Sequence, residues 1–116
     1  MDAITITGIR GFGFHGVFEE EKRSGQEFLV DLRIEKDLSK AGSSDALEDT
    51  VDYAAIATLT KELIESGSFD LIERLATVIA ERIKAQFLIR AIEVTVHKPN
   101  APVGIAVSDI SVTIRR

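Results

Sequence analysis

The sequence of 116 residues has no cysteine and no tryptophan, one tyrosine and two histidines. Without cysteine the chain has no disulfide, no thiolate nucleophile and no thiolate metal ligand, which is compatible with a reducing cytoplasm. His15 and His97 are too few and too unaccompanied to form a zinc site. We therefore expect neither a metal nor another cofactor.

Excess positive charge and long apolar runs are also lacking. Lys and Arg number 14 against 19 Asp and Glu, and the net charge of -5 disfavours a nucleic-acid backbone or an anionic membrane as the main partner. No apolar run approaches the roughly 20 residues of a membrane-spanning helix, and Asp2 follows Met1 where a secretory leader would become basic and then apolar. We expect a cytoplasmic protein that forms a single domain over residues 1–116.

Alternating apolar and polar residues predict two strands near the N-terminus. Residues 4–14 alternate around a break at Gly8, which indicates a strand with a bulge, and residues 28–34 form the clearest strand of the chain. The charged stretch between them, from His15 to Phe28, is too long for a minimal hairpin turn. A solvated loop tip is its ordinary explanation, but we interpret it as a functional loop because glycines stand near both of its ends.

Two helices follow a turn-rich connection at residues 37–49. The first begins around Asp52 or Tyr53 and ends at Gly67, and the second carries an apolar stripe at helical spacing between Leu71 and Ile83. Three residues are available to cap the first helix, namely Asp49, Thr50 and Asp52. Asp70 and Glu73 have the spacing of a capping box at the start of the second. The short link between the helices predicts that they lie antiparallel.

Two more alternating segments, 92–96 and 107–114, predict a third and a fourth strand. The order of two strands, two helices and two strands (ββααββ) predicts an α+β fold, with a four-stranded antiparallel or mixed sheet and both helices on one face. The other face should meet water because its residues are polar: Asp31, Arg33, Glu35, Glu93, Thr95, Ser111 and Thr113. Open sheet edges favour edge-to-edge assembly of several copies into a ring.

Three residues are candidates for chemistry, although each also has an ordinary structural explanation. A carboxylate at Glu73, in a first helical turn, can accept two parallel hydrogen bonds from an amidine-like ligand edge, or it can simply cap the helix. Tyr53, the only tyrosine, is otherwise an amphipathic edge residue. Lys98, at the exit of the third strand, is otherwise a solvated charge.

Four stretches in the right order, HGVFEEEKRSGQEF, DTVDY, FDLIERLA and EVTVHKPNAP, together resemble the dihydroneopterin aldolase family of folate biosynthesis, from about Ile4 to Arg115. The resemblance implies the tunnelling fold (T-fold), in which four subunits close a barrel and two such rings form a homo-octamer. It also implies that Glu73 grips the aminopyrimidinone edge of a pterin, helped by backbone groups around Leu71 and Ile72. Tyr53, with Val51 nearby, would come from the neighbouring subunit and cover the ring.

The remaining implied roles concern the substrate's tail. Glu21 would hydrogen-bond the glycerol-like side chain, and Lys98 would act in proton transfer with an ordered water. An aldolase of this family needs neither metal nor Schiff base, since the imine of a dihydropterin accepts the electrons released by carbon–carbon cleavage. Epimerase side activity is implied by the same mechanism.

Two rivals stay open from the sequence. A dihydroneopterin triphosphate epimerase would favour an additional basic pocket, for which Lys22 and Arg23 are available. A non-catalytic pterin-binding protein would keep Glu73 but lose the proton-transfer group. The run PNAPVGIAVSD also lacks the aromatic residue that family members often have after the lysine, so the shape of the loop from Pro99 to Val107 is left undetermined.

Overall fold

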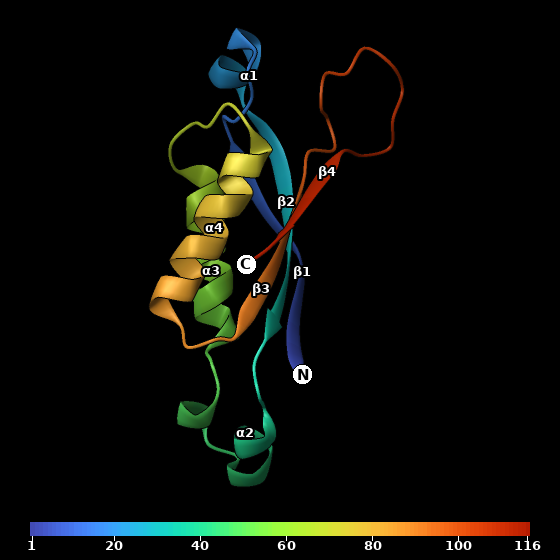
Figure 1. The fold of residues 1–116 in the computed structure, drawn as a ribbon. Helices are drawn as coiled ribbons and strands as arrows, with labels where there is room; N and C mark the ends of the chain where they lie inside the picture. The colour runs from blue at the N-terminus through green and yellow to red at the C-terminus, as the bar shows by residue number, and fades with distance from the viewer.

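A four-stranded antiparallel sheet forms one layer of the molecule, and helices α3 and α4 cover one of its faces (Figure 1). Each strand pairs with the next in the chain, which gives the order β1-β2-β3-β4. The computed structural model describes all 116 residues. Its elements are β1 Ala3–Gly13, α1 Glu19–Ser24, β2 Gln26–Glu35, α2 Ser39–Ser44, the 3-10 helix η1 Leu47–Asp49, α3 Tyr53–Glu65, α4 Ile72–Gln86, β3 Ala91–His97 and β4 Ser111–Arg115. The predicted ββααββ order is confirmed, and none of the helices has the length and apolar character of a membrane span.

The predicted bulge in β1 is present at Gly8. The pairing of β1 with β2 shifts register between Ile6 and Ile9, and Gly8 adopts a φ of 74°, a conformation that favours glycine. The Gly8 N–H donates a hydrogen bond of 2.7 Å to Oδ1 of Asp31 on β2. The bulge therefore points a backbone donor at the polar face of the sheet.

Helix α3 begins at Tyr53 with Asp52 as its N-cap, one of the three predicted caps. The Asp52 side chain accepts hydrogen bonds from the N–H groups of Ala54 and Ala55 at 3.0 and 3.2 Å. α3 and α4 run in opposite directions along the sheet, as predicted (Figure 1). The start of α3 therefore lies beside the end of α4, far from the start of α4.

The predicted capping box of α4 is wrong. The helix begins at Ile72 with Leu71 at the N-cap, and no side chain caps it. Asp70 lies one residue too early, and its Oδ1 instead accepts a hydrogen bond from Nζ of Lys22 at 2.5 Å. Glu73 is thus free of the capping role that the sequence suggested.

Two connections and the start of one strand also differ from the predictions. The loop from His15 to Phe28 contains the short helix α1, and the connection at 37–49 contains α2 and η1. β4 begins at Ser111 and not near Val107, because its pairing partner β3 ends at His97 opposite Ser111, so earlier residues have no strand to pair with. Residues 98–110 leave the sheet as a long loop (Figure 1).

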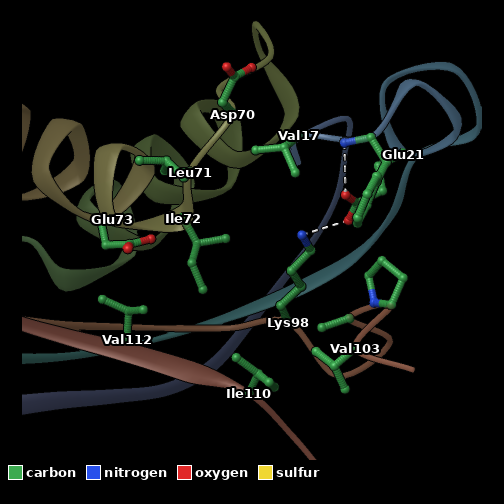
Figure 2. Close-up of a pocket in the computed structure, with 13 residues that line it drawn as sticks. Val17, Glu21, Asp70, Leu71, Ile72, Glu73, Lys98, Val103, Ile110 and Val112 are labelled. Atoms are coloured by element: carbon green, nitrogen blue, oxygen red, sulfur yellow. Dashed lines mark hydrogen bonds and ion pairs between the residues drawn. The ribbon is translucent and has the colours of Figure 1, made fainter. Parts of the chain in front are cut away.

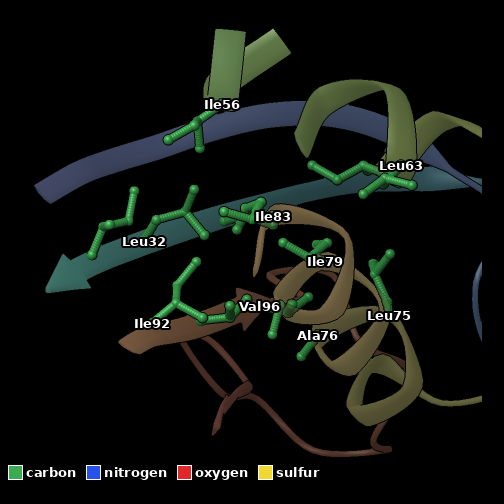
Figure 3. Packing of buried hydrophobic residues seen from close by; sticks show 14 of the residues in the cluster. Leu32, Ile56, Leu63, Leu75, Ala76, Ile79, Ile83, Ile92 and Val96 are labelled. Atoms are coloured by element: carbon green, nitrogen blue, oxygen red, sulfur yellow. The ribbon is translucent and has the colours of Figure 1, made fainter. Parts of the chain in front are cut away.

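The core lies between the apolar face of the sheet and the two helices. Figure 3 shows Val96 on β3 near Ile79 of α4, with Leu32 of β2 and Ile56 of α3 toward one end of the cluster and Leu75 of α4 toward the other, and all five are at most 1% exposed. Truncating one such side chain to alanine typically costs about 2 to 5 kcal/mol. This packing fixes the start of α4 relative to the exit of β3.

The opposite face of the sheet is polar, as predicted, and no element covers it. Arg115 donates two hydrogen bonds to the Glu35 carboxylate at 3.0 and 2.9 Å, and the hydroxyls of Thr95 and Thr113 lie 2.8 Å apart. These cross-strand contacts stabilise the sheet without a second apolar layer.

Candidate active site

A pocket of about 310 Å³ opens where α1, the start of α4 and the loop after β3 meet (Figure 2). Most of its lining is apolar, and its charged side chains come from different elements. The lining residues are Val17, Phe18, Glu21, Asp70, Leu71, Ile72, Glu73, Lys98, Ala101, Pro102, Val103, Ile110 and Val112. An apolar cavity with a few convergent polar groups is the usual form of a small-molecule site.

An ion pair joins Glu21 and Lys98 on one wall of this pocket. Lys98 Nζ lies 2.6 Å from Glu21 Oε2, and their side chains are only 13% and 7% exposed. Figure 2 shows Lys98 reaching from the strand layer toward Glu21 in α1. Glu21 is therefore not at the solvated loop tip that its charged neighbours suggested.

Further hydrogen bonds hold the Glu21 carboxylate. Its Oε1 accepts from the Phe18 N–H at 3.3 Å, and its Oε2 accepts from Nε2 of Gln26 at 2.9 Å. Burial acts to raise the pKa of Glu21, but hydrogen bonds from Lys98, Gln26 and the Phe18 backbone outweigh it and bring the pKa below its ordinary value. The group is a carboxylate at neutral pH.

His15, fully buried, fixes the loop that carries Glu21. The Phe69 N–H donates to its Nδ1 at 3.0 Å, so the ring proton sits on Nε2 and is donated to the Ile64 carbonyl at 2.7 Å. The Gly16 N–H also donates to the Phe69 carbonyl at 2.9 Å. Burial lowers the pKa of His15, so the ring is neutral and its role is to connect the loop to Ile64 and Phe69 by hydrogen bonds. The sequence alone did not single out this role.

Glu73 lies in the first turn of α4 across the pocket from Lys98 (Figure 2). Leu71 and Ile72 precede it on the same wall, where the first turn of a helix offers N–H groups without intrahelical partners. The structure therefore gathers Glu21, Lys98, Glu73, Leu71 and Ile72 around one cavity. Its acceptors and donors suit a flat, polar heterocycle.

Tyr53 and Val51, the other two predicted site residues, lie away from this pocket. Tyr53 starts α3 and is 63% exposed, while Val51 is buried nearby. α3 has 13 residues, about 20 Å of helix, and it runs antiparallel to α4, whose first turn carries Glu73. Within one chain, Tyr53 and Glu73 are thus at opposite ends of the helical layer.

Comparison with known proteins identifies the family. The family model described as FolB, dihydroneopterin aldolase, matches residues 4–115. A dihydroneopterin aldolase of Streptococcus pyogenes is 46% identical over 105 residues, which cover 90% of this chain and 88% of the relative. The dihydroneopterin aldolase of Bacillus subtilis is 38% identical over 117 residues, covering 100% and 98%.

The fold of the chain also matches that of a solved relative along nearly its whole length. The crystal structure of E. coli dihydroneopterin aldolase in complex with neopterin has a TM-score of 0.92 and 29% identity, and the match covers 100% of this chain and 99% of that one. The tunnelling fold expected from the sequence is thereby confirmed. Matched along nearly its whole length in sequence and in fold, this chain belongs to the dihydroneopterin aldolase family.

Proposed function

We propose that the chain cleaves 7,8-dihydroneopterin by a retro-aldol reaction into 6-hydroxymethyl-7,8-dihydropterin and glycolaldehyde, in folate biosynthesis, at the pocket between α1 and α4. The observation that carries the assignment of the site is the buried Lys98–Glu21 pair on the pocket wall. Cleavage of a hydroxylated side chain requires a proton acceptor and a proton donor beside that chain. The pair supplies both kinds of group at one place.

Glu73 and the backbone at the start of α4 would hold the pterin ring. The ring's amino and N–H edge presents two parallel donors, which a carboxylate accepts with good geometry. The apolar side chains of Ile72 and Val112 then face the flat ring. The hydroxylated tail would extend toward Glu21 and Lys98, because those are the polar groups at the other side of the cavity.

The reaction itself asks for proton transfers and no bound metal. Lys98, acting through a water, removes the proton of the second side-chain hydroxyl, and the bond between the first and second side-chain carbons breaks. The ring imine receives the electron pair, which leaves an enamine that is then protonated on carbon. Lys98 can pass a proton to the Glu21 carboxylate, whose Oε2 lies 2.6 Å from Nζ, and so act as the neutral amine that accepts the hydroxyl proton through the water. The proton donor we assign to the last step is Tyr53.

Tyr53 must come from a second copy of the chain, because within one chain it is at the other end of the helices. The free edges of β1 and β4 are suited to pairing with further copies. As the resemblance to the family implies, we infer rings of four subunits, stacked in pairs as an octamer, with the polar sheet face lining a tunnel. The cytoplasmic location inferred from the sequence also stays a prediction.

Two alternatives remain for the test to separate. A triphosphate epimerase needs free cations for its substrate, but Lys22 is paired with Asp70, and Arg23 is paired with Glu20, which favours the aldolase. Epimerase side activity follows from the proposed mechanism, since glycolaldehyde can add back to the other face of the enamine. A non-catalytic pterin binder would have no need of the Lys98–Glu21 pair.

Incubation with 7,8-dihydroneopterin, followed by chromatography of both products, tests the proposal. Lys98→Ala should reduce product formation on the order of a hundredfold, the usual loss for positioned proton transfer. Arg115→Gln is a matched control, because it removes a cation from the opposite, polar face. Absence of both products with the wild type, or faster turnover of the triphosphate, would reject the aldolase in favour of a binder or an epimerase.

A further inference from the structure

A histidine adjacent to Lys98 makes a three-way contact on the other side of the sheet. His97 ends β3, and its Nε2 lies 2.7 Å from Oδ2 of Asp31 while its Nδ1 lies 2.7 Å from Oδ2 of Asp109. Both partners are carboxylates. A neutral imidazole has one N–H, so two short hydrogen bonds to carboxylate acceptors require the doubly protonated, cationic ring.

The cluster connects four separate segments of the chain. Asp31 on β2 also accepts the bond from the Gly8 N–H in the bulge of β1. Asp109 belongs to the loop 98–110, whose only other tie near that end is the bond of 2.7 Å from the Lys98 N–H to the Ile110 carbonyl. The two contacts together fix both ends of the loop.

The same loop builds one wall of the pocket. Ala101, Pro102, Val103 and Ile110 all line it, and Lys98 stands at its first position. Successive residues at a strand end point to opposite faces of the sheet, so His97 lies on the polar face while Lys98 reaches into the pocket. If Asp109 moved away from His97, the loop that forms this wall of the pocket would be free to move, and so would the backbone that carries Lys98.

We propose that His97 is a positioning residue, whose cationic ring ties Asp109 to Asp31 and thereby holds the 98–110 loop and the Lys98 side chain in place for the reaction. This inference rests on the proposed function, since it concerns the same pocket. His97 touches no part of the cavity, and its effect reaches the substrate through Lys98 and the loop.

The contact of His97 with Asp109 and Asp31 depends on the protonation of the His97 ring. The hydrogen bond to Asp109 raises the pKa of His97, partial burial opposes it, and the hydrogen bond to Asp31 adds to the increase. Few other charges lie around the ring, because Ser111 faces it from β4 and Thr95 precedes it on its own face. The remaining charged groups on that face of the neighbouring strands are Glu93 on β3, Arg33 and Glu35 on β2, Arg115 on β4, and Arg10 on β1, which pairs with Glu27.

The sign of the pH effect follows from the raised pKa. The contact is intact below the ordinary histidine value of 6.5 and is lost as pH rises through the higher value of the folded protein. kcat/KM should therefore have an alkaline decline that coincides with the titration of His97. His15 and His97 are the only histidines, so two imidazole signals can be followed by NMR, with buried His15 as internal reference.

The test compares Asp109→Asn with Arg115→Gln, a control on the same face whose partner is Glu35. Asp109→Asn should lower kcat/KM roughly tenfold, the loss of one charge-assisted hydrogen bond, and move both the His97 titration and the alkaline decline to lower pH. Amide hydrogen exchange in residues 98–110 should also quicken. His97→Gln should give the same loss with that decline removed.

Two results would overturn the positioning role. One is unchanged exchange of the 98–110 loop in Asp109→Asn, and the other is a shifted His97 titration with kcat/KM and its pH decline unmoved. A wild type that cleaves no dihydroneopterin refutes the proposed function separately. In that case the positioning role of His97 is tested by amide hydrogen exchange in the 98–110 loop and by affinity for neopterin. If Asp109→Asn and wild type have the same exchange rates and the same affinity, the positioning role is wrong.

Discussion

Nζ of Lys98, just beyond β3, lies 2.6 Å from Oε2 of Glu21 in α1. The two side chains are almost buried, so removing either charge leaves the other unpaired in a site poorly reached by water. The pair also joins the charged loop after β1 to the exit of β3. Its geometry therefore affects both the stability of the fold and the chemistry of the pocket.

The first prediction concerns acid stability. The folded-state pKa of Glu21 is below its ordinary value of 4.5 despite burial, because Lys98, Gln26 and the Phe18 N–H bind the carboxylate. Its contribution is thus present above pH 4.5 and is lost as pH falls through the folded value. Urea unfolding across this range should show a steeper decline for wild type than for Glu21→Gln. Parallel declines would mean that the carboxylate contributes no pH-dependent stability.

A second prediction tests how the Glu21 loop is built. Gly16 has a φ of 152°, and a Cβ placed there would lie 2.3 Å from Oε1 of Glu21. Gly16→Ala should therefore displace the carboxylate and lower both the free energy of unfolding and kcat/KM. Gly42→Ala in α2 is the control, because nothing lies within 4 Å of its Cβ position. A Gly16→Ala protein with wild-type kcat/KM would show that the loop tolerates the shift.

Much of this architecture was predictable because its signals are local. The alternation along β2, the break at Gly8 and the aspartate before Tyr53 each determine a few neighbouring residues, and each prediction was confirmed. Helix α1 was missed because its six residues are mostly charged and have no apolar stripe. The N-cap of α4 was misplaced because Asp70 had a distant competing partner, Lys22.

The site required contacts that no local pattern contains. Glu21 and Lys98 were chosen through family resemblance, but their ion pair depends on how α1 folds over the end of β3. His97 was considered only as a metal ligand, since the register that brings Asp31 beside it joins distant parts of the chain. Strand register and side-chain pairing between distant parts of the chain could therefore not be predicted from local sequence patterns.

The third prediction concerns pterin binding. Glu73→Gln replaces a charged acceptor with an amide that presents a donor to a ligand donor, so affinity for neopterin should fall about tenfold to a hundredfold. Since Glu73 makes no capping bond, the stability of α4 should change little. Titration calorimetry measures the affinity, with Glu81→Gln, an exposed position later in the same helix, as control. Equal weakening by both variants would point to a general charge effect.

A fourth prediction follows from the distance between Tyr53 and the pocket. If each site takes Lys98 from one copy and Tyr53 from another, mixing Tyr53→Ala with Lys98→Ala protein after dissociation should restore activity. Random equal mixing gives about one intact site in four. Separate reassociation of each variant is the control. Mixed assemblies that stay as inactive as the separate ones would contradict the shared site.

The last prediction separates the two proton transfers. Lys98→Ala should slow carbon–carbon cleavage itself, since that residue acts on the hydroxyl proton. Tyr53→Phe keeps the aromatic ring but removes the donor, so cleavage should continue while protonation of the enamine is impaired. The longer-lived enamine should react with dissolved oxygen, and part of the pterin should appear as an oxidised product such as dihydroxanthopterin. Single-turnover reactions with and without oxygen, analysed by chromatography, measure this partition. Equal loss of glycolaldehyde and of hydroxymethyl product in Tyr53→Phe, with no oxidised pterin in air, would assign the final protonation to another group.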